Sequence, residues 1–392
     1  MKKDRNKKIK IAFIFGTRPE TIKIFPVIRE VKKYPFWIEP IIILTAQHRE
    51  MLDQMINLFQ IHPDIDLDIM RHGQSLSQIN SQALLKLGEV LKKSQPDLVL
   101  VQGDTTTTFS GALAAFYQKI KVGHLEAGLR TGKKYYPYPE EINRRLTTVL
   151  TDYHFTPTKV SAQILLKEGI AKENVFISGN TVIDALMLMQ KSSFNFSNQK
   201  INDLLDKKKQ VLLVTMHRRE NWGKPLENLC HALSLINQKH ENLFIIFPVH
   251  KNPIIREVIF NHLKEKKNII LIEPLNYQEM ANLMALSTLI LTDSGGIQEE
   301  APALGKPVLI LRTETERPEV EKIGAAKLVG TEIEGISREV ERLLSSPGEY
   351  RKMVINKSPY GDGKAAKRIV EYILYQYYYL DQPPLEYIFN FD

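Results

Sequence analysis

The chain has 392 residues, of which 43% are apolar, and this is enough for two domains of roughly 150–200 residues with buried cores. Its net charge of +8 is concentrated in residues 1–10, which carry six basic side chains and one acidic one. The near-neutral remainder predicts no nucleic-acid partner. The chain has no signal-peptide pattern, no run of 18 apolar residues and no second cysteine beside Cys230, which predicts a cytoplasmic protein without a membrane span.

Short apolar strands alternate with segments of helical period in the first half of the chain. Strands are expected at 9–15, 41–44, 97–101, 121–125, 153–156 and 175–177. Helices are expected at 17–33, 49–59, 77–93, 106–117, 140–150 and 160–168. Such alternation predicts βαβ units and a parallel sheet covered by helices on both faces.

The same alternation restarts after a plausible hinge at Gly179-Asn180 and a polar, lysine-rich stretch, 192–209, which we interpret as a surface connection. Strands are expected at 211–215, 243–247, 269–272, 289–292 and 308–311, with helices at 226–238, after Pro253, at 278–286, after Gly296 and at 365–378. The chain is therefore predicted to be α/β, with two doubly wound, Rossmann-like parallel sheets. The tyrosine-rich end is expected to dock on its own fold or on a partner chain.

The stretch 289–300 reads LILTDSGGIQEE and predicts a strand, a turn and a helix start. Gly295 and Gly296 would leave the N–H groups of the helix start open to an anion. An ordinary strand–turn–helix corner is the alternative. Glu300 lies one helical turn further on, and its carboxylate would repel a phosphate, so it is better suited to the hydroxyls of a sugar such as ribose.

Charged side chains follow several predicted strands, at the sheet edge where such folds gather catalytic groups. In the first half they are Arg18, Lys23, Asp104, Glu126, Glu140 and Arg144. Cations at a helix start oppose the helix dipole, so Arg18 and Lys23 indicate an anionic partner, although a solvated first turn is the alternative. Asp104 can also be read as a helix cap, and His124, which alternates with Glu126, as a core histidine.

In the second half, His217, His250 and Arg317 follow predicted strands. His217 is placed to donate to a leaving phosphate, although a solvated loop explains it equally well. The sequence has no G-x-G-x-x-G after a strand, no P-loop, no H-E-x-x-H and no cysteine-rich metal spacing. We therefore expect neither a nicotinamide cofactor nor a metal.

Taken together, the motifs resemble the non-hydrolysing UDP-N-acetylglucosamine 2-epimerases of bacteria and archaea. They are FGTRPE, TAQHREMLD, VQGDTTTT, GHLEAGLRTG, YPEEINRR, FISGNTVIDAL, HRREN, PVHKNP, DSGGIQEEAPALGKPVL, ERPE and PYGDG. The resemblance implies the two-sheet GT-B architecture and a homodimer. It also implies an N-terminal domain of residues 1–179 with 365–392, because the last helix crosses back, and a nucleotide-binding domain of residues 180–364.

The resemblance further implies that UDP-GlcNAc and UDP-ManNAc interconvert without a cofactor, supplying ManNAc for surface polysaccharides. The C2 proton and UDP leave together to give 2-acetamidoglucal, and UDP returns with protonation of the opposite face. The acid/base residues would be Asp104, Glu126 and Glu140, with His217 at the leaving diphosphate. Substrate would be held by Arg18, Lys23, Arg144, His250, Ser294, Gly295, Gly296, Glu300 and Arg317.

Some bacterial members of that family bind a second UDP-GlcNAc as an activator, near positions that match Gln47, His48 and His250. This chain has Glu50 where some of those members have glutamine. Two other classes of function stay open: a GT-B glycosyltransferase, which would release UDP only with an acceptor, and a nucleotide-sugar sensor without turnover. Within the epimerases, a hydrolysing relative would release free ManNAc, and another would prefer a uronate.

Overall fold

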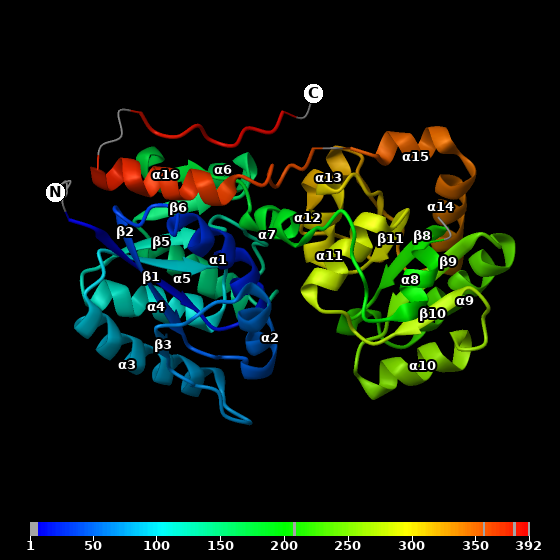
Figure 1. The fold of residues 1–392 in the computed structure, drawn as a ribbon, viewed down its shortest axis with the longest axis horizontal. Coiled ribbons are helices and arrows are strands. Elements are labelled where there is room, and N and C mark those ends of the chain that lie inside the picture. The colour runs from blue at the N-terminus through cyan, green and yellow to red at the C-terminus, as the bar shows by residue number, and fades with distance from the viewer. Residues whose placement is uncertain (1–6, 207–208, 356, 379–381, 391–392) are drawn as a thin grey trace. The chain divides into compact units, whose positions relative to one another are not determined.

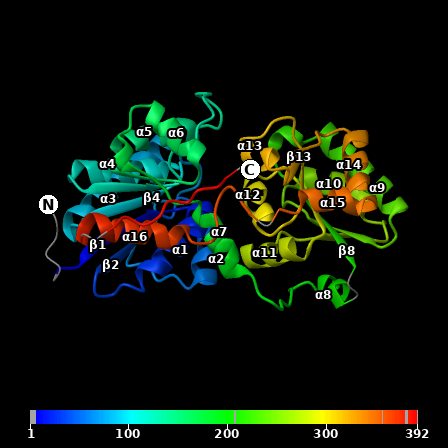
Figure 2. The same cartoon turned by 90° about the horizontal axis from the view of Figure 1, so that it is seen from above.

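The computed structural model describes residues 7–206, 209–355, 357–378 and 382–390. Within the described residues the chain forms two compact units, one that runs to Ala185 and takes up Tyr360–Asn390, and one of Leu186–Pro359 (Figures 1 and 2). Each unit is a parallel sheet with its own helices. The domain limits expected from the sequence, 1–179 with 365–392 and 180–364, stay a prediction.

The sheet of the first unit has seven strands in the order β3-β2-β1-β4-β5-β6-β7. Neighbouring strands are parallel throughout. The strand order reverses between β1 and β4, and such a switch point is where open α/β sheets bind ligands. The strands are β1 (Ile9–Phe15), β2 (Ile38–Leu44), β3 (Ile65–Asp66), β4 (Leu98–Gln102), β5 (Lys121–Leu125), β6 (Tyr153–Thr156) and β7 (Val175–Ile177).

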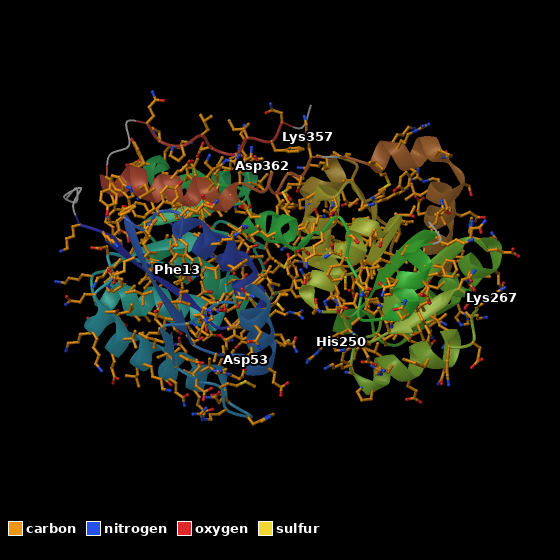
Figure 3. All side chains as sticks on the ribbon, in the orientation of Figure 1. Phe13, Asp53, His250, Lys267, Lys357 and Asp362 are labelled. Carbon is orange, nitrogen blue, oxygen red and sulfur yellow. The ribbon has the colours of Figure 1, made fainter. Side chains whose placement is uncertain are left out.

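Helices cover this sheet because their apolar faces pack on its buried strands. Phe13 in β1 is fully buried (Figure 3), and Val99 and Val101 of β4 pack in one cluster with Leu87 and Ala112 of the helices. The helices are α1 (Arg18–Val31), α2 (Arg49–Phe59), α3 (Leu76–Ser94), α4 (Thr106–Tyr117), α5 (Glu140–Leu150), α6 (Lys159–Lys167), η1 (Lys172–Asn174), α7 (Thr181–Met189) and α16 (Ala365–Tyr378).

The second unit has six parallel strands in the order β10-β9-β8-β11-β12-β13, with its switch point between β8 and β11. They are β8 (Gln210–Thr215), β9 (Leu243–Pro248), β10 (Ile269–Ile272), β11 (Leu289–Thr292), β12 (Val308–Ile310) and β13 (Ala326–Leu328). The helices are α8 (Gln199–Asp206), η2 (Arg219–Asn221), α9 (Lys224–Lys239), α10 (Pro253–Leu263), α11 (Tyr277–Leu286), α12 (Gly295–Ala303), α13 (Pro318–Lys322), α14 (Ile333–Ser345) and α15 (Pro347–Met353).

The stretch predicted to be an irregular surface connection contains helix α8. Ile201 and Leu204 of this helix are buried, so they anchor it to the core. The prediction was wrong here because a helix of eight residues is too short to show a clear apolar period. Among the described residues, no helix is both long and apolar enough to cross a membrane.

The tyrosine-rich end docks on the first unit, which is one of the two outcomes expected for it. Helix α16 packs against α1, and its Tyr377 hydroxyl donates to the carbonyl of Asp97 at 3.0 Å. The Tyr378 hydroxyl donates to the Trp37 carbonyl at 2.8 Å. Further along, the Tyr387 N–H donates to the Ile177 carbonyl of the edge strand β7 at 2.7 Å, so the tail covers an edge that would otherwise be open.

The start of α16 is closed by a buried carboxylate from α7. Asp184 accepts hydrogen bonds from the N–H groups of Ala365 at 3.1 Å and Ala366 at 2.9 Å. These bonds satisfy two of the N–H groups that a helix start leaves without partners. Burial nevertheless raises the pKa of Asp184 to about 6, with a further contribution from Asp362.

We predict that Asp184 makes the protein less stable as pH rises. Since its folded-state pKa lies above the unfolded value of about 3.9, the folded protein binds the extra proton, and stability falls as pH rises from about 4 to 6. The variant Asp184→Asn should lack this component, whose full size is about 3 kcal/mol. Urea unfolding of both proteins across this range measures it. A wild-type minus variant difference that does not change with pH would contradict the prediction.

Candidate active site

The loop after β1 brings the chain close to neighbouring strands at the switch point of the first unit. A Cβ atom at Gly16 would lie 1.9 Å from Thr45 Oγ1 and 2.9 Å from Thr107 Oγ1, so only glycine fits. Arg18 opens α1 and is exposed, and it forms no ion pair within the described part of the chain. Its guanidinium is therefore available to an anion.

Glu126 follows β5 and is held by donors from several elements. Its Oε1 pairs with Lys23 Nζ of α1 and accepts from Asn180 Nδ2 at 3.1 Å. Its Oε2 accepts from Gln102 Nε2 of β4 at 2.6 Å. The backbone of Glu126 has a φ of 65°, a left-handed conformation that costs energy for a non-glycine residue and is found at functional sites.

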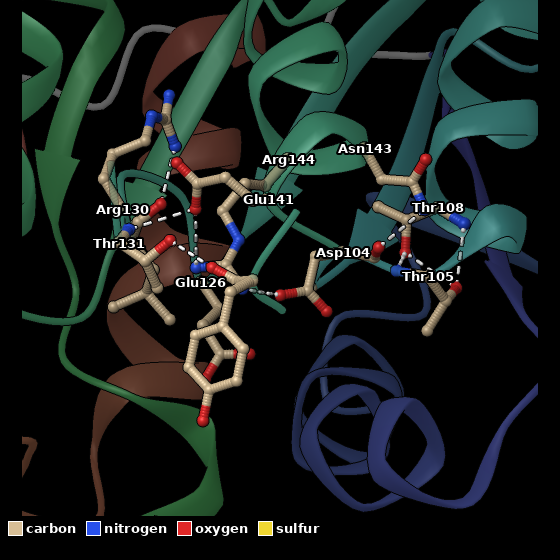
Figure 4. A network of polar contacts seen from close by, with 12 residues as sticks. Asp104, Thr105, Thr108, Glu126, Arg130, Thr131, Glu141, Asn143 and Arg144 are labelled. Carbon is tan, nitrogen blue, oxygen red and sulfur yellow. Dashed lines mark hydrogen bonds and ion pairs between the residues drawn. The ribbon is translucent and has the colours of Figure 1, made fainter. Parts of the chain in front are cut away.

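Asp104 follows β4 and forms an ion pair with Arg144 of α5 at 2.5 Å (Figure 4). Arg144 lies 3.6 Å from the buried Glu141, whose carboxylate also accepts from the N–H groups of Thr131 and Gly132. The alternative reading of Asp104 as a helix cap is wrong, because Thr105 is the N-cap of α4. The Asp104 side chain is instead turned toward Arg144.

Glu140 is the third predicted acid/base group, at the first residue of α5. It is half-buried and forms no ion pair with any described residue. Burial raises the pKa of Glu140, the charge of Asp104 raises it further, and Arg144 partly opposes this. A Cβ atom on Gly103 would lie 3.7 Å from Glu126 Oε2. The carboxylates of residues 104, 126 and 140 are therefore gathered at one sheet edge.

His124 is a core residue, as one of its two readings expected. It is fully buried, and its Nε2 lies 2.6 Å from the carbonyl of Gly103, to which it donates. Burial lowers the pKa of His124 to about 3. The imidazole is therefore neutral, and it anchors the loop that carries Asp104 instead of transferring protons.

In the second unit, the start of α12 is lined by two guanidinium groups. Ser294 is the N-cap residue and makes no side-chain cap hydrogen bond. A Cβ atom on Gly295 would lie 3.7 Å from Arg218 Nη2 and 3.7 Å from Arg317 Cζ. Glu316 lies 3.6 Å from Arg218, and Glu299 pairs with Arg317 at 2.7 Å. Helix N–H groups and two cations together form a site for an anion.

His217 follows β8 and meets Asp293 at the end of β11. Its Nδ1 lies 3.1 Å from Asp293 Oδ1. Asp293 is fully buried and also accepts from the backbone N–H groups of His217 and Arg218 and from Asn221 Nδ2. Burial acts to raise the pKa of Asp293, but these hydrogen bonds outweigh it and lower the pKa. The pair leaves Nε2 of His217 directed away from Asp293.

Asp293 and Arg218 were not predicted as site residues. The carboxylate of Asp293 bonds to the loop after β8, which contains Arg218. The polar run HRREN after a strand could have indicated Arg218 as a site residue. Local spacing does not show that Arg218 bonds to Asp293, which lies 75 residues away.

Glu300, predicted for a ribose, lies in the first turns of α12. Its Oε1 accepts from the Tyr277 hydroxyl at 2.7 Å, and its Oε2 lies 3.9 Å from a Cβ atom placed on Gly296. Burial and the charge of Glu300 raise the pKa of Tyr277 well above its usual value. The carboxylate is therefore close to the glycines of the anion site.

The three candidate activator residues belong to different units. Gln47 Oε1 accepts from the N–H and the hydroxyl of Thr107 at the start of α4. His48 is exposed and is the N-cap of α2. His250 is exposed in the second unit (Figure 3), and burial and the nearby His217 lower its pKa.

The first unit thus gathers carboxylates with Lys23 and Arg144, whereas the second gathers cations and helix N–H groups around an anion site. In the described ranges, no three His, Cys, Asp or Glu side chains are grouped to hold a metal ion. This arrangement suits proton transfer to and from carbon by the first unit and binding of a phosphorylated leaving group by the second.

Known proteins resemble this chain over most of its length. A family model described as UDP-N-acetylglucosamine 2-epimerase matches residues 29–374. The UDP-N-acetylglucosamine 2-epimerase of Bacillus subtilis is 49% identical, over 96% of this chain and 98% of its own. A crystal structure of a UDP-N-acetylglucosamine 2-epimerase has a TM-score of 0.89 at 46% identity, covering 97% of this chain and 100% of that chain. The UDP-GlcNAc 2-epimerase from Neisseria meningitidis, bound to UDP-GlcNAc, has a TM-score of 0.82 at 47% identity, covering 93% and 100%.

We predict that Arg218 contributes to anion binding and that its neighbour Arg219 does not. Replacing Arg218 with alanine should weaken binding of inorganic pyrophosphate about 10- to 100-fold, because one charged hydrogen bond contributes about 1.5–3 kcal/mol. Arg219 is exposed and makes no ion pair in the part of the chain that the structure describes, so Arg219→Ala is the matched control. Calorimetric titration measures both. Equal losses in the two variants would contradict the assigned anion site.

Proposed function

Because the chain belongs to the UDP-N-acetylglucosamine 2-epimerase family, we propose that it interconverts UDP-GlcNAc and UDP-ManNAc by eliminating UDP and adding it back. The activity is that of an isomerase. The observation that carries the proposal is the group of three carboxylates at one edge of the first sheet, each with a different electrostatic environment. Proton transfer on two faces of one carbon requires two acid/base groups in different environments, and this group of carboxylates can supply them.

The elimination step places clear demands on the protein. A carboxylate takes the proton from C2, the C2–H electron pair forms the C1=C2 double bond, and the bond between C1 and the phosphate oxygen breaks. The products are 2-acetamidoglucal and UDP, which leaves with the electron pair. In the return step the phosphate oxygen adds to C1 and a proton reaches C2 from the opposite face. No electron enters or leaves overall, so the reaction needs no redox cofactor.

The three carboxylates divide these tasks by environment. Asp104 and Glu126 each have a cation beside them, Arg144 and Lys23, and this ion pair holds each carboxylate in one orientation. Glu140 forms no ion pair among the described residues, and burial raises its pKa. Of the three it is the group most suited to give a proton to C2.

The second unit supplies the leaving-group side of the reaction. Asp293 fixes His217 through Nδ1, so His217 Nε2 is the atom proposed to donate to the departing diphosphate. Arg218 and Arg317, with the N–H groups of Gly295 and Gly296 and the side chain of Ser294, would hold its charge. Glu300, oriented by Tyr277, would accept from the ribose hydroxyls. Arg18 remains as a further cation for the substrate.

Other parts of the proposal are supported by the family resemblance. They are the homodimer, the supply of ManNAc for surface polysaccharides, a cytoplasmic location and an activating second UDP-GlcNAc near Gln47, His48 and His250. The exposed His48 and His250 are consistent with binding a ligand. An acceptor-dependent glycosyltransferase would instead leave the C2 proton unexchanged, so deuterium at C2 after incubation in heavy water separates the two functions.

We predict that Asp104→Asn and Glu126→Gln each lower kcat for epimerisation by at least about 100-fold, because a positioned acid/base group contributes 10²–10⁴. The affinity for UDP should change by less than about threefold, because the residues proposed to hold UDP are other ones. Proton NMR of UDP-GlcNAc in heavy water measures deuterium at C2 and the appearance of UDP-ManNAc. If both variants keep wild-type rates, the assigned acids are wrong.

Glu140 allows a test of which face each group serves. If Glu140 delivers the proton that inverts C2, Glu140→Gln should stop formation of UDP-ManNAc while exchange of the C2 proton of UDP-GlcNAc with heavy water continues. Loss of the base that opens the reaction abolishes both signals. Inversion at the wild-type rate in Glu140→Gln would exclude Glu140 as the donor. The neighbouring Arg145, which is exposed, provides a control as Arg145→Ala.

A further inference from the structure

We propose that Glu20 is a positioning residue that locks the loop after β1 to the loop after β4 and so holds Asp104 in place for proton transfer. The inference deepens the proposed function and rests on the role assigned to Asp104. The hydrogen bonds of Glu20 within the described ranges go to Gly16, Thr17, Thr105 and Thr108. Glu20 was not among the candidates from the sequence.

One oxygen of Glu20 holds the loop after β1. Glu20 is the third residue of α1 and is 1% exposed. Its Oε2 accepts from the backbone N–H of Gly16 at 2.9 Å and of Thr17 at 2.8 Å. The bond to Thr17 is the usual capping-box bond at a helix start. The bond to Gly16 extends it to the end of β1, next to Arg18.

The other oxygen of Glu20 reaches across the switch point. Its Oε1 accepts from the Thr105 hydroxyl at 2.5 Å and lies 3.1 Å from the Thr108 hydroxyl. Thr105 directly follows Asp104 and is the N-cap of α4. The Thr108 hydroxyl also donates to the carbonyl of Gln102 at 2.7 Å. Glu20 is thus bonded to Thr105, directly after Asp104, and it lies beside the Thr108 hydroxyl, which is bonded to Gln102 before Asp104.

A helix cap alone does not explain this arrangement. A buried carboxylate without a cation is costly, and Glu20 pairs with no lysine or arginine among the residues described. Burial raises the pKa of Glu20, against four hydrogen bonds that lower it. Local rules of stability are most often broken at functional sites. We therefore infer that the free-energy cost of burying the Glu20 carboxylate is retained because Glu20 fixes the geometry of the two loops.

The first turns of α1 hold two of the proposed acid/base groups in position. Glu20 fixes the Asp104 loop, and Lys23, one turn later, pairs with Glu126. Displacing a catalytic group by about 1 Å can cost about 100-fold in rate. Losing Glu20 should therefore affect the chemical step more than the binding of substrate.

The test compares Glu20 with a glutamate in the same local motif. Glu279 is also buried, is also the third residue of a helix with a capping box, and accepts from Ser197 and Asn276. It is not bonded to any strand-end loop of the first unit. Glu20→Ala and Glu279→Ala should each lower the urea concentration at the midpoint of unfolding, because each removes a buried hydrogen-bond acceptor. Only Glu20→Ala should lower kcat, by about 10- to 100-fold with KM within about threefold.

A conservative variant keeps the inference testable if Glu20→Ala folds poorly. In Glu20→Gln the amide oxygen can accept from Gly16 and Thr17, and the amide NH2 can donate to the Thr105 and Thr108 hydroxyl oxygens. This variant should recover kcat to within about fivefold of wild type. If kcat falls equally in the alanine and glutamine variants, the charge of Glu20 matters and its positioning role is refuted.

A double variant separates this inference from the proposed function. If Glu20 acts through Asp104, adding Glu20→Ala to Asp104→Asn should lower the residual kcat by less than about threefold, because groups that act together are not additive. If Asp104→Asn keeps the wild-type rate, the role of Asp104 in the proposed function is refuted, and the positioning role of Glu20 with it. If Asp104→Asn is impaired but Glu20→Ala matches Glu279→Ala in kcat, only the positioning role is refuted.

Discussion

In both units, one buried carboxylate connects the loops that carry the candidate site residues at the edge of the sheet. The switch point of a doubly wound sheet brings together two loops that are far apart in the sequence, and the sheet hydrogen bonds end before those loops begin. Asp293 spans this gap between β11 and the loop after β8. Glu20 spans the corresponding gap between the loop after β1 and the start of α4. Both carboxylates accept backbone N–H groups, which are strong, directional donors to a charge.

Several of the charges that are proposed to act on the substrate have a partner of the opposite sign. In the first unit, Arg144 holds Asp104 and Lys23 holds Glu126. In the second unit the arrangement is reversed, because Glu299 holds the cationic Arg317. Such pairing keeps a side chain in one orientation before substrate arrives, which is how preorganised sites lower a barrier.

The sequence predicted the fold well because its signals are local. Apolar runs, Gly–Thr turns and helical periods place β1, α2, α4 and β5 at the residues where the structure has them. The GT-B class of two Rossmann-like sheets is confirmed by the strand orders and by the solved relatives. Helix α8 was missed because its eight residues show the helical period over only about two turns.

The candidate site was predicted only in part, because many of its contacts join residues that are far apart in the sequence. Residues that follow strands, such as Asp104 and Glu126, can be found from the strand pattern alone. Residues that act by holding others depend on contacts that cross the sheet. Glu20 bonds to Thr105, 85 positions away, and Asp293 bonds to Asn221, 72 positions away. No spacing rule along the chain reveals such partners, which only the strand order brings together.

The central claim is that the bond between C1 and the phosphate oxygen breaks and re-forms during epimerisation. It is tested most directly with UDP-GlcNAc that carries oxygen-18 in the bridge between C1 and phosphorus. If the bond breaks, the label should spread to the non-bridging oxygens of the same phosphate as UDP-ManNAc forms, and phosphorus NMR resolves this change. Epimerisation with the label still in the bridge would show that the bond stays intact.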